Sequence, residues 1–295
     1  MYSPDEYEIL AEVCSVACIT ILSIIFGRKV ASIEGRVYYI RGLLLALYIC
    51  SWIVALLGCM FTSTNNGNSA SCWLSFFNMS LIYTINKIIL YLYWIEKMYI
   101  IEMPKTSRLR SFCYNFNVII LFPYIALVVL MIYYRVIDVA QELPYHCTIG
   151  YKLPASITVL CYDIFVILMF TLMFAKYHYM PTPAQRDSQY AVAIRITTGR
   201  NALIGVAALI TSLVKYGLTI SYQGGLRGLV ATCVTILDVT IVACVVHWVS
   251  THPAETQFMD RILPEQNNNE KPLKLEIKQH QEVVVLTELT SKSPL

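Results

Sequence analysis

The sequence predicts an all-α fold, a bundle of seven transmembrane helices with its N-terminus outside and its C-terminus inside. The first of three observations behind this prediction is composition. Of the 295 residues, 57% are hydrophobic and 14% are charged, and the mean hydropathy is +0.58. Soluble chains carry about 25% charged residues. The composition therefore predicts a lipid bilayer as the main partner, and it disfavours a nucleic-acid-binding protein, a secreted disulfide scaffold and a cytosolic enzyme.

The second observation is the presence of seven long apolar segments. A bilayer core about 30 Å thick is crossed by about 20 helical residues. Segments of about this length or longer lie at 9–26, 40–61, 72–101, 118–134, 153–177, 201–220 and 228–247. They are continuous rather than alternating, which favours helices over the strands of a membrane barrel.

The third observation is the distribution of lysine and arginine between the connecting segments. The first, third and fifth connectors hold twelve of these residues, whereas the second, fourth and sixth hold three. The twelve are Arg28, Lys29, Arg36, Arg41, Lys97, Lys105, Arg108, Arg110, Lys176, Arg186, Arg195 and Arg200. Because basic residues are retained on the cytoplasmic side, the odd-numbered connectors are predicted to be cytoplasmic.

These assignments divide the chain into a short extracellular N-terminus (1–8), a seven-helix domain (9–250) and a disordered cytoplasmic tail (251–295). The N-terminus is acidic, whereas a cleavable signal peptide begins with basic residues, so the first helix is expected to be an uncleaved anchor. The tail combines amide-rich and mixed-charge sequence, which is typical of a solvated segment. Alternatively, Phe258, Ile262 and Leu263 form a short helix on the inner leaflet.

Ten cysteines occur in the chain, and two of them differ from the rest. Cys72 and Cys147 both fall on the predicted outer, oxidising side, where two thiols are expected to form a disulfide rather than remain free. The alternative is that both stay unpaired. The other eight are expected to be reduced thiols within the helices or on the inner side.

Glu96, Lys97 and Tyr99 lie at the inner end of the third segment. Glu96 follows Cys72 by 24 residues, or about 36 Å of helix, which is enough to cross the membrane. An outer cysteine opening the third helix, a partner cysteine in the next outer loop and an acid followed by a base at the inner end resemble G-protein-coupled receptors. The alternative is that Glu96 and Lys97 are ordinary interfacial charges.

Looser similarities point to receptor-like seven-helix proteins of fungi. They are carried by Cys147-Thr-Ile-Gly150, Tyr162-Asp163, Arg200-Asn201, Leu237-Asp238-Val239 and His247-Trp248. The resemblance implies a plasma-membrane receptor for an unknown extracellular small ligand or peptide, with a heterotrimeric G protein as its cytoplasmic partner. It assigns Glu96, Lys97 and Tyr99 to a cytoplasmic switch.

Four ionisable side chains fall inside predicted spans. Inserting a charge there costs at least about 2.5–3.5 kcal/mol of free energy, so each charge is expected to have a partner or a functional role. If the third helix neighbours the seventh and the fifth neighbours the sixth, two pairs are possible. Lys87 with Asp238 is the predicted lock, and Asp163 with Lys215 is the predicted polar floor of a ligand pocket. The alternative for Lys215 is that its flexible side chain extends and places the ammonium in water.

Aromatic residues in the outer halves of the helices are candidates to line that pocket. They are Phe76, Phe77, Tyr83 and Tyr162. The alternative for these residues is ordinary packing and interfacial anchoring.

Two other functions were compared with the receptor. An enzyme is not expected, because the five histidines are scattered and no nucleophile motif occurs, and neither a metal site nor a cofactor is predicted. A transporter or channel for a small solute or proton is the alternative function, since buried Lys and Asp can relay protons. The absence of duplicated halves argues against a transporter.

Overall fold

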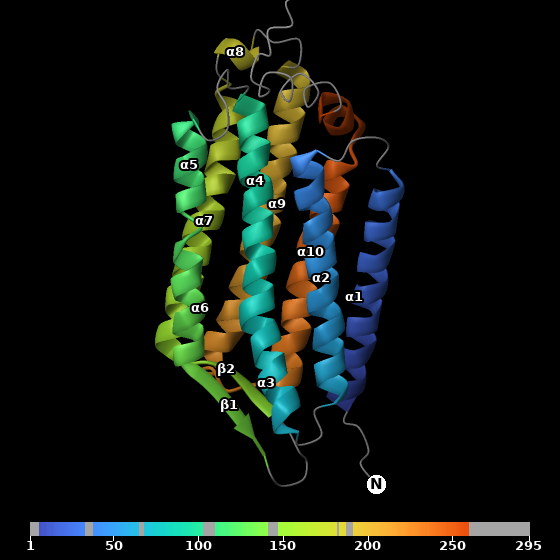
Figure 1. The fold of residues 1–295 in the computed structure, drawn as a ribbon, viewed down its shortest axis with the longest axis vertical. Coiled ribbons are helices and arrows are strands. Elements are labelled where there is room, and N and C mark those ends of the chain that lie inside the picture. Colours follow the sequence, from blue (N-terminus) through green and yellow to red (C-terminus); the bar gives the residue numbers. More distant parts are fainter. Residues whose placement is uncertain are drawn as a thin grey trace, which may run out of the picture.

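The structure is a computed structural model that describes residues 6–32, 38–64, 68–102, 110–140, 147–181, 183–186 and 191–259. Helices make up most of the described chain (Figure 1). They are α1 (Glu6–Ala31), α2 (Tyr39–Ser63), α3 (Ser69–Phe77), the π-helix η1 (Asn78–Ile82), α4 (Tyr83–Glu102), α5 (Phe112–Ile119), α6 (Pro123–Tyr133), α7 (Leu153–Tyr179), α8 (Pro183–Arg186), α9 (Ala191–Ser221) and α10 (Gly228–Ser250). A further short helix covers residues 253–259.

Among the described residues, six helices are long and apolar enough to cross a membrane. They are α1, α2, α5 with α6, α7, α9 and α10. The third predicted span is helical throughout, because α3, η1 and α4 follow one another without a break. None of these three pieces counts among the six by itself, since α3 and η1 are short and α4 carries Lys87, Glu96 and Lys97. The integral-membrane class is therefore supported. That the span formed by α3, η1 and α4 is a seventh membrane crossing, and the orientation of the termini, remain predictions.

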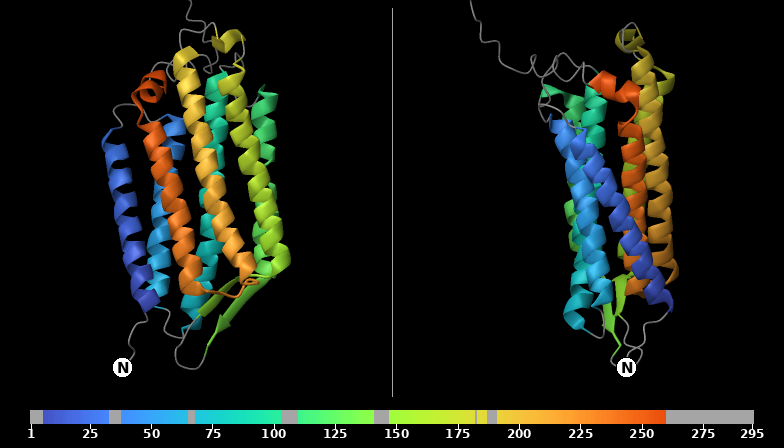
Figure 2. Two further views of the ribbon diagram at one scale, coloured as in Figure 1. Left: turned by 180° about the vertical axis from the view of Figure 1, so that it is seen from behind. Right: turned by 90° about the vertical axis from the view of Figure 1, so that its right-hand side faces the viewer.

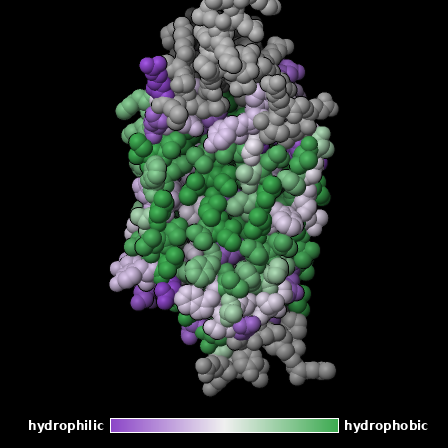
Figure 3. Space-filling model, in the orientation of Figure 1, coloured by the Kyte–Doolittle hydropathy of each residue, from purple (hydrophilic) through white to green (hydrophobic). Residues whose placement is uncertain are grey.

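The surface has the pattern expected of a protein in a bilayer. A broad apolar band surrounds the middle of the visible face, and hydrophilic residues gather towards both ends (Figure 3). Large apolar side chains point away from the bundle on several helices, including Leu10, Phe122 and Leu172, each more than 60% exposed. A water-soluble monomer rarely exposes so much contiguous apolar surface, so hydrocarbon is the physically suitable solvent for this face.

The helices pack around α4. Side views show α2 and α4 in one layer and α9 and α10 in the other, with α1 at the edge against α2 and α10 (Figure 2). α7 packs along α9, and most residues of α4 are buried. α4 therefore contacts α2 in one layer and α10 in the other.

The structure corrects several predicted boundaries. The predicted span 118–134 begins earlier, at Phe112, and its α-helix is interrupted before Pro123, because proline has no backbone N–H to donate to the carbonyl of Ile119. The predicted span 201–220 begins at Ala191, so Arg195 and Arg200 belong to α9 rather than to a connector. The prediction of a disordered tail over 251–295 is wrong for its first part, because residues 253–259 are helical and Phe258 is buried. Ile262 and Leu263 lie outside the described residues.

The prediction of an all-α fold omits a small antiparallel sheet at one end of the bundle, which we call the strand end. Its strands are β1 (Arg135–Val139), β2 (Cys147–Tyr151) and β3 (Leu226–Arg227), in that spatial order. Ile137 pairs with Ile149, and Ile149 also pairs with Leu226. The opposite end carries Arg28, Lys29 and Arg41, and we call it the basic end.

Candidate functional site

The buried ionisable residues meet in one cluster in the interior of the bundle. Lys87 on α4 lies between two carboxylates, with its Nζ 3.6 Å from Asp163 Oδ2 on α7 and 3.8 Å from Asp238 Oδ2 on α10. The same ammonium donates a hydrogen bond to Ser212 Oγ on α9 at 2.7 Å. Lys87 therefore joins four helices through one side chain. We call Lys87, Asp163, Asp238 and Lys215 the charge cluster.

Tyrosine hydroxyls supply further hydrogen bonds to both carboxylates. Tyr91 and Tyr124 donate to Asp163 Oδ1 at 2.5 and 2.8 Å, and Tyr83 donates to Asp238. All three rings are buried. A buried carboxylate needs such donors because it has lost its hydration shell. The tyrosine hydroxyls therefore satisfy part of the hydrogen-bonding capacity of Asp163 and Asp238 beside Lys87.

Lys215 on α9 occupies a different position from the predicted one. Its Nζ lies 2.8 Å from the centroid of the Tyr83 ring and has no hydrogen-bond partner. A cation is attracted to the face of an aromatic ring, which supplies part of the stabilisation here. Lys87 lies beside Asp238, its predicted partner, whereas Asp163 lies beside Lys87 and not beside Lys215; the role of the first pair as a lock stays a prediction. Lys215 also does not extend to water, because it is 4% exposed.

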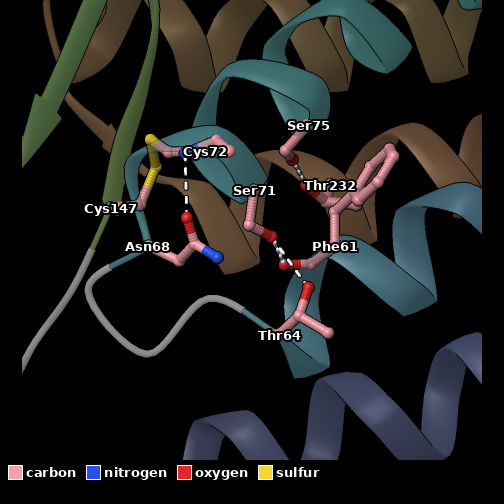
Figure 4. The surroundings of a disulfide bond; sticks show 9 residues. Phe61, Thr64, Asn68, Ser71, Cys72, Ser75, Cys147 and Thr232 are labelled. Atoms are coloured by element: carbon pink, nitrogen blue, oxygen red, sulfur yellow. Dashed lines mark hydrogen bonds between the residues drawn. A yellow bond between two sulfur atoms is a disulfide. The ribbon is translucent and has the colours of Figure 1, made fainter.

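The disulfide lies at the strand end. Cys72 on α3 and Cys147 on β2 are paired at bonding distance, with their Cα atoms 6.0 Å apart, as predicted (Figure 4). The backbone N–H of Cys72 donates to Asn68 O at 3.2 Å, and the Asn68 side chain caps α3 by accepting from the Ala70 N–H. The pairing fixes the central strand of the sheet to the start of the rod that contains α4.

Hydroxyl contacts attach the same region to the neighbouring helices. Ser71 Oγ donates to Phe61 O at 3.0 Å and lies 2.8 Å from Thr64 Oγ1, and Ser75 Oγ lies 3.1 Å from Thr232 Oγ1 on α10 (Figure 4). α3 is thus connected to α2 and α10 as well as to the sheet.

At the basic end, the predicted switch residues are buried rather than presented on the surface. Lys97 donates to Glu255 of the short helix 253–259, and the two residues are 3% and 1% exposed. Glu96 is fully buried, and the Tyr99 ring lies 5.5 Å from the ring of Tyr114. Neither Glu96 nor Lys97 is an ordinary interfacial charge, since protein covers both.

A second contact covers this end of α4 from the other side. Gln185, on α8 between α7 and α9, donates through Nε2 to Ile101 O at 3.0 Å. Gln185 is 1% exposed. The part of α4 at the basic end is therefore held by Glu255 and by Gln185.

None of the four predicted pocket residues lines either of the two cavities at the basic end. Phe76 is buried with its ring 5.7 Å from Tyr151 on β2, and Phe77 packs on Phe76. Tyr83 belongs to the charge cluster, and Tyr162 donates to Ile120 O at 2.5 Å. These contacts are those of packing residues, which was the alternative interpretation of the sequence.

Two of the cavities in the described part of the chain lie at the basic end. One, of about 280 Å³, lies between α1, α2, α4 and α10 and includes Lys97 and Glu255 in its lining. The other, of about 580 Å³, lies where α7, α8 and α9 meet, beside Gln185 and Arg195. Within the described ranges, no group of three or more His, Cys, Asp and Glu side chains is placed to hold a metal ion.

Several members of these contacts were missed at the level of sequence, among them Tyr91, Tyr124 and Ser212. Tyr91 follows the predicted Lys87 by four residues, so a polar stripe on one face of α4 was available as a signal. Ser212 precedes the predicted Lys215 by three residues, which places both on one face of α9. Glu255 and Gln185 had no comparable signal, because both fall in polar sequence that predicts solvent exposure.

No protein-family model matches this chain, and no curated protein matches it. The proposed function therefore rests on the geometry of the site.

Proposed function

We propose that the protein is a seven-helix integral membrane receptor resembling G-protein-coupled receptors, with the strand end outside and the basic end in the cytoplasm. The excess of Lys and Arg at the basic end supports this orientation. The cysteine pair at the strand end agrees with it, because disulfides persist on the oxidising side of a membrane. In this topology the rod formed by α3, η1 and α4 is the third crossing.

One observation carries the proposal: a single rod contacts its surroundings at three successive levels. Cys72 attaches it to the sheet, Lys87 attaches it to α7, α9 and α10, and Lys97 attaches it to Glu255. A displacement at the strand end changes the position of the rod relative to both layers of the bundle. A receptor needs this kind of connection between an outer and an inner surface.

In the proposed mechanism, an extracellular ligand binds at the strand end and shifts the population between two packings of the helices. The contacts of α4 with Glu255 and Gln185 close the inner end in the resting packing. The π-helix η1, between Cys72 and Lys87, is the segment that adjusts, since π-helical turns occur within helices at functional sites. Opening of the inner end then exposes Glu96, Lys97 and Tyr99 to a G protein.

The proposal is tested by nucleotide exchange on a purified G-protein α subunit in the presence of vesicles that contain the protein. We expect Glu255→Gln to raise basal exchange about tenfold, because the lost charged hydrogen bond removes roughly 1.4 kcal/mol or more from the closed packing. Glu102→Gln is the matched control, since Glu102 is an exposed glutamate at the end of α4. If vesicles containing the protein or the Glu255→Gln variant do not accelerate nucleotide exchange, the result contradicts coupling to that class of α subunit.

A transporter of protons or a small solute is the second candidate, and the charge cluster favours it. Lys215 Nζ and one oxygen each of Asp163 and Asp238 have no hydrogen-bond partner although they are buried. Buried ionisable groups with such spare capacity are typical of proton and ion pathways. Vesicles loaded with a pH-sensitive dye test it. Proton movement that disappears in Asp163→Asn but persists in Asp138→Asn, an exposed aspartate on β1, supports transport.

A further inference from the structure

The rod formed by α3, η1 and α4 contains one turn that is wider than the rest. Over Asn78–Ile82 the backbone is π-helical, and the N–H of Tyr83 donates to Asn78 O, five residues back instead of four. The regular α-helices α3 and α4 continue on both sides. A single π-turn inside an α-helix holds one residue more than an α-helical turn, so η1 contains one extra residue of the rod.

Side-chain contacts with α2 support the widened turn. Asn78 Nδ2 donates to Val54 O at 3.0 Å, which attaches the start of η1 to α2. Cys50 Sγ on α2 donates to Ile82 O at 3.8 Å, at the end of η1. Side-chain donors of this kind satisfy backbone carbonyls where the regular helical pattern is interrupted inside a membrane. The widened turn is therefore held against α2 at both of its ends.

The rod is fixed on both sides of η1, so the extra residue cannot be lost by turning one end. Cys72 is bonded to Cys147 on β2, and Lys97 donates to Glu255. The extra residue can then change its place only by moving along the rod between these two contacts. Each residue that the widened turn passes rotates by about 100° and moves by about 1.5 Å towards the basic end, which is one step of an α-helix.

Such a shift changes which residue of α4 faces the charge cluster. If the widened turn passes Lys87, Asn86 takes the place that Lys87 now occupies. That place lies between Asp163 and Asp238. Asn86 is 4% exposed and at present accepts a hydrogen bond from Ser51 Oγ on α2 at 3.1 Å. Its amide is a neutral donor, so the carboxylates keep a hydrogen-bond partner in the shifted register but lose the ammonium.

We propose that the π-turn moves along this rod and that the ion pairs of Lys87 hold it at η1. The ion pairs oppose the shift, because the shift removes the ammonium from two buried carboxylates. Movement past Lys87 changes the contacts of α4 with α7, α9 and α10, while Cys72 and Lys97 keep their partners. The shift itself rests on the contacts described above, whereas its use as a signalling switch rests on the proposed receptor function.

Cysteine cross-linking reports the register of α4 directly. In the observed register the side chains at positions 51 and 86 are in contact, whereas Ile85 is 44% exposed and faces away from the bundle. In the shifted register position 85 replaces position 86 beside Ser51. The pair Ser51→Cys, Asn86→Cys therefore reports the observed register, and the pair Ser51→Cys, Ile85→Cys reports the shifted one.

The cross-links are measured in the purified full-length protein in lipid nanodiscs. Copper phenanthroline oxidises the thiols, and mass spectrometry identifies the linked peptides. All variants carry Cys50→Ser, which removes the neighbouring thiol and keeps a donor to the widened turn. Deletion of Leu81, which is 41% exposed, removes the extra residue and leaves both halves of the rod in their present register. Deletion of Ile89 is the matched control, because it displaces either Lys87 or Lys97.

We expect both cross-links in the chain without a deletion, with the 85–51 link as the minor product. Deletion of Leu81 should reduce the 85–51 link at least about tenfold and preserve the 86–51 link. Lys87→Met should increase the 85–51 link, because the ion pairs that oppose the shift are lost. The thermal unfolding midpoint should decrease by less than about 5 °C on deletion of Leu81 and on the order of 10 °C on deletion of Ile89.

Each outcome decides the proposal. An 85–51 link that is absent even in Lys87→Met, or that forms equally after deletion of Leu81, overturns a moving turn. Equal losses of stability in the two deletions overturn the extra residue in η1, and absence of the 86–51 link overturns the assigned register. No G protein takes part, so a failure of the receptor proposal in nucleotide exchange does not alter these results.

Discussion

Replacing Lys87 by methionine is expected to destabilise the bundle more than any other single change in the charge cluster. The side chain keeps a similar length, but the ammonium that lies between Asp163 and Asp238 is lost. The remaining carboxylates retain only tyrosine donors, and their mutual repulsion is no longer compensated. Ser212 also loses the hydrogen bond from Lys87.

The magnitude follows from the distances. At an effective dielectric constant of about 20, unit charges separated by 3.6 and 3.8 Å attract by roughly 4–5 kcal/mol each. Desolvation of the three ions and repulsion between the carboxylates offset much of this attraction. Removal of one partner from a buried ion pair typically costs about 3–5 kcal/mol, which is the loss that we expect for Lys87→Met.

A double-mutant cycle separates this electrostatic cause from a simple packing defect. Reversing the charges at positions 87 and 238 is unsuitable, because the carboxylate introduced at position 87 would face Asp163. Combining Lys87→Met with Asp238→Asn instead removes the repulsion between the two carboxylates that Lys87→Met alone leaves uncompensated. The double variant should be more stable than Lys87→Met alone by about 1–3 kcal/mol.

The measurement is the thermal unfolding midpoint of the purified protein in detergent. A loss of 3–5 kcal/mol corresponds to a decrease on the order of 10 °C. Lys176→Met and Asp138→Asn are the controls, since both residues are exposed. If the effects of Lys87→Met and Asp238→Asn simply add, the pairing does not contribute as the geometry indicates.

Two further changes test the packing outside the charge cluster. Cys147→Ser opens a disulfide that joins positions 75 residues apart and should cost about 4 kcal/mol in the chain-entropy account, as measured by unfolding, whereas Cys161→Ser, an exposed free cysteine, should change little. Gly205→Ala places a Cβ against Thr171 Oγ1 and should separate α9 from α7 at a cost of about 1–3 kcal/mol. Gly27→Ala meets nothing within 4 Å and should be neutral or stabilising by up to about 1 kcal/mol, so equal midpoints for the two glycine variants would contradict the close approach.

Much of the architecture follows from local sequence. Uninterrupted apolar runs identify helices, because a backbone in hydrocarbon must satisfy its own hydrogen bonds. The pairing of Cys72 with Cys147 and the proximity of Lys87 to Asp238 were also predicted, the first from the expected membrane side and the second from the expected helix neighbours. The strands were missed because they are short and lie in connectors, and the pairing of Thr148 with Arg227, which are distant in sequence, leaves no local pattern.

The sequence by itself determined the membrane class, the apolar helices and the presence of charges that need partners inside the bundle, because hydropathy and charge cost are properties of each segment. Only the tertiary structure decided which partner each charge has. Asp163 lies beside Lys87 rather than Lys215, and Glu255 folds back onto Lys97, because the rotation and contact of packed helices depend on the whole bundle. Composition near Glu255 predicted a solvated tail, yet the uncompensated charge of a buried lysine provides a physical reason for that carboxylate to be buried beside it.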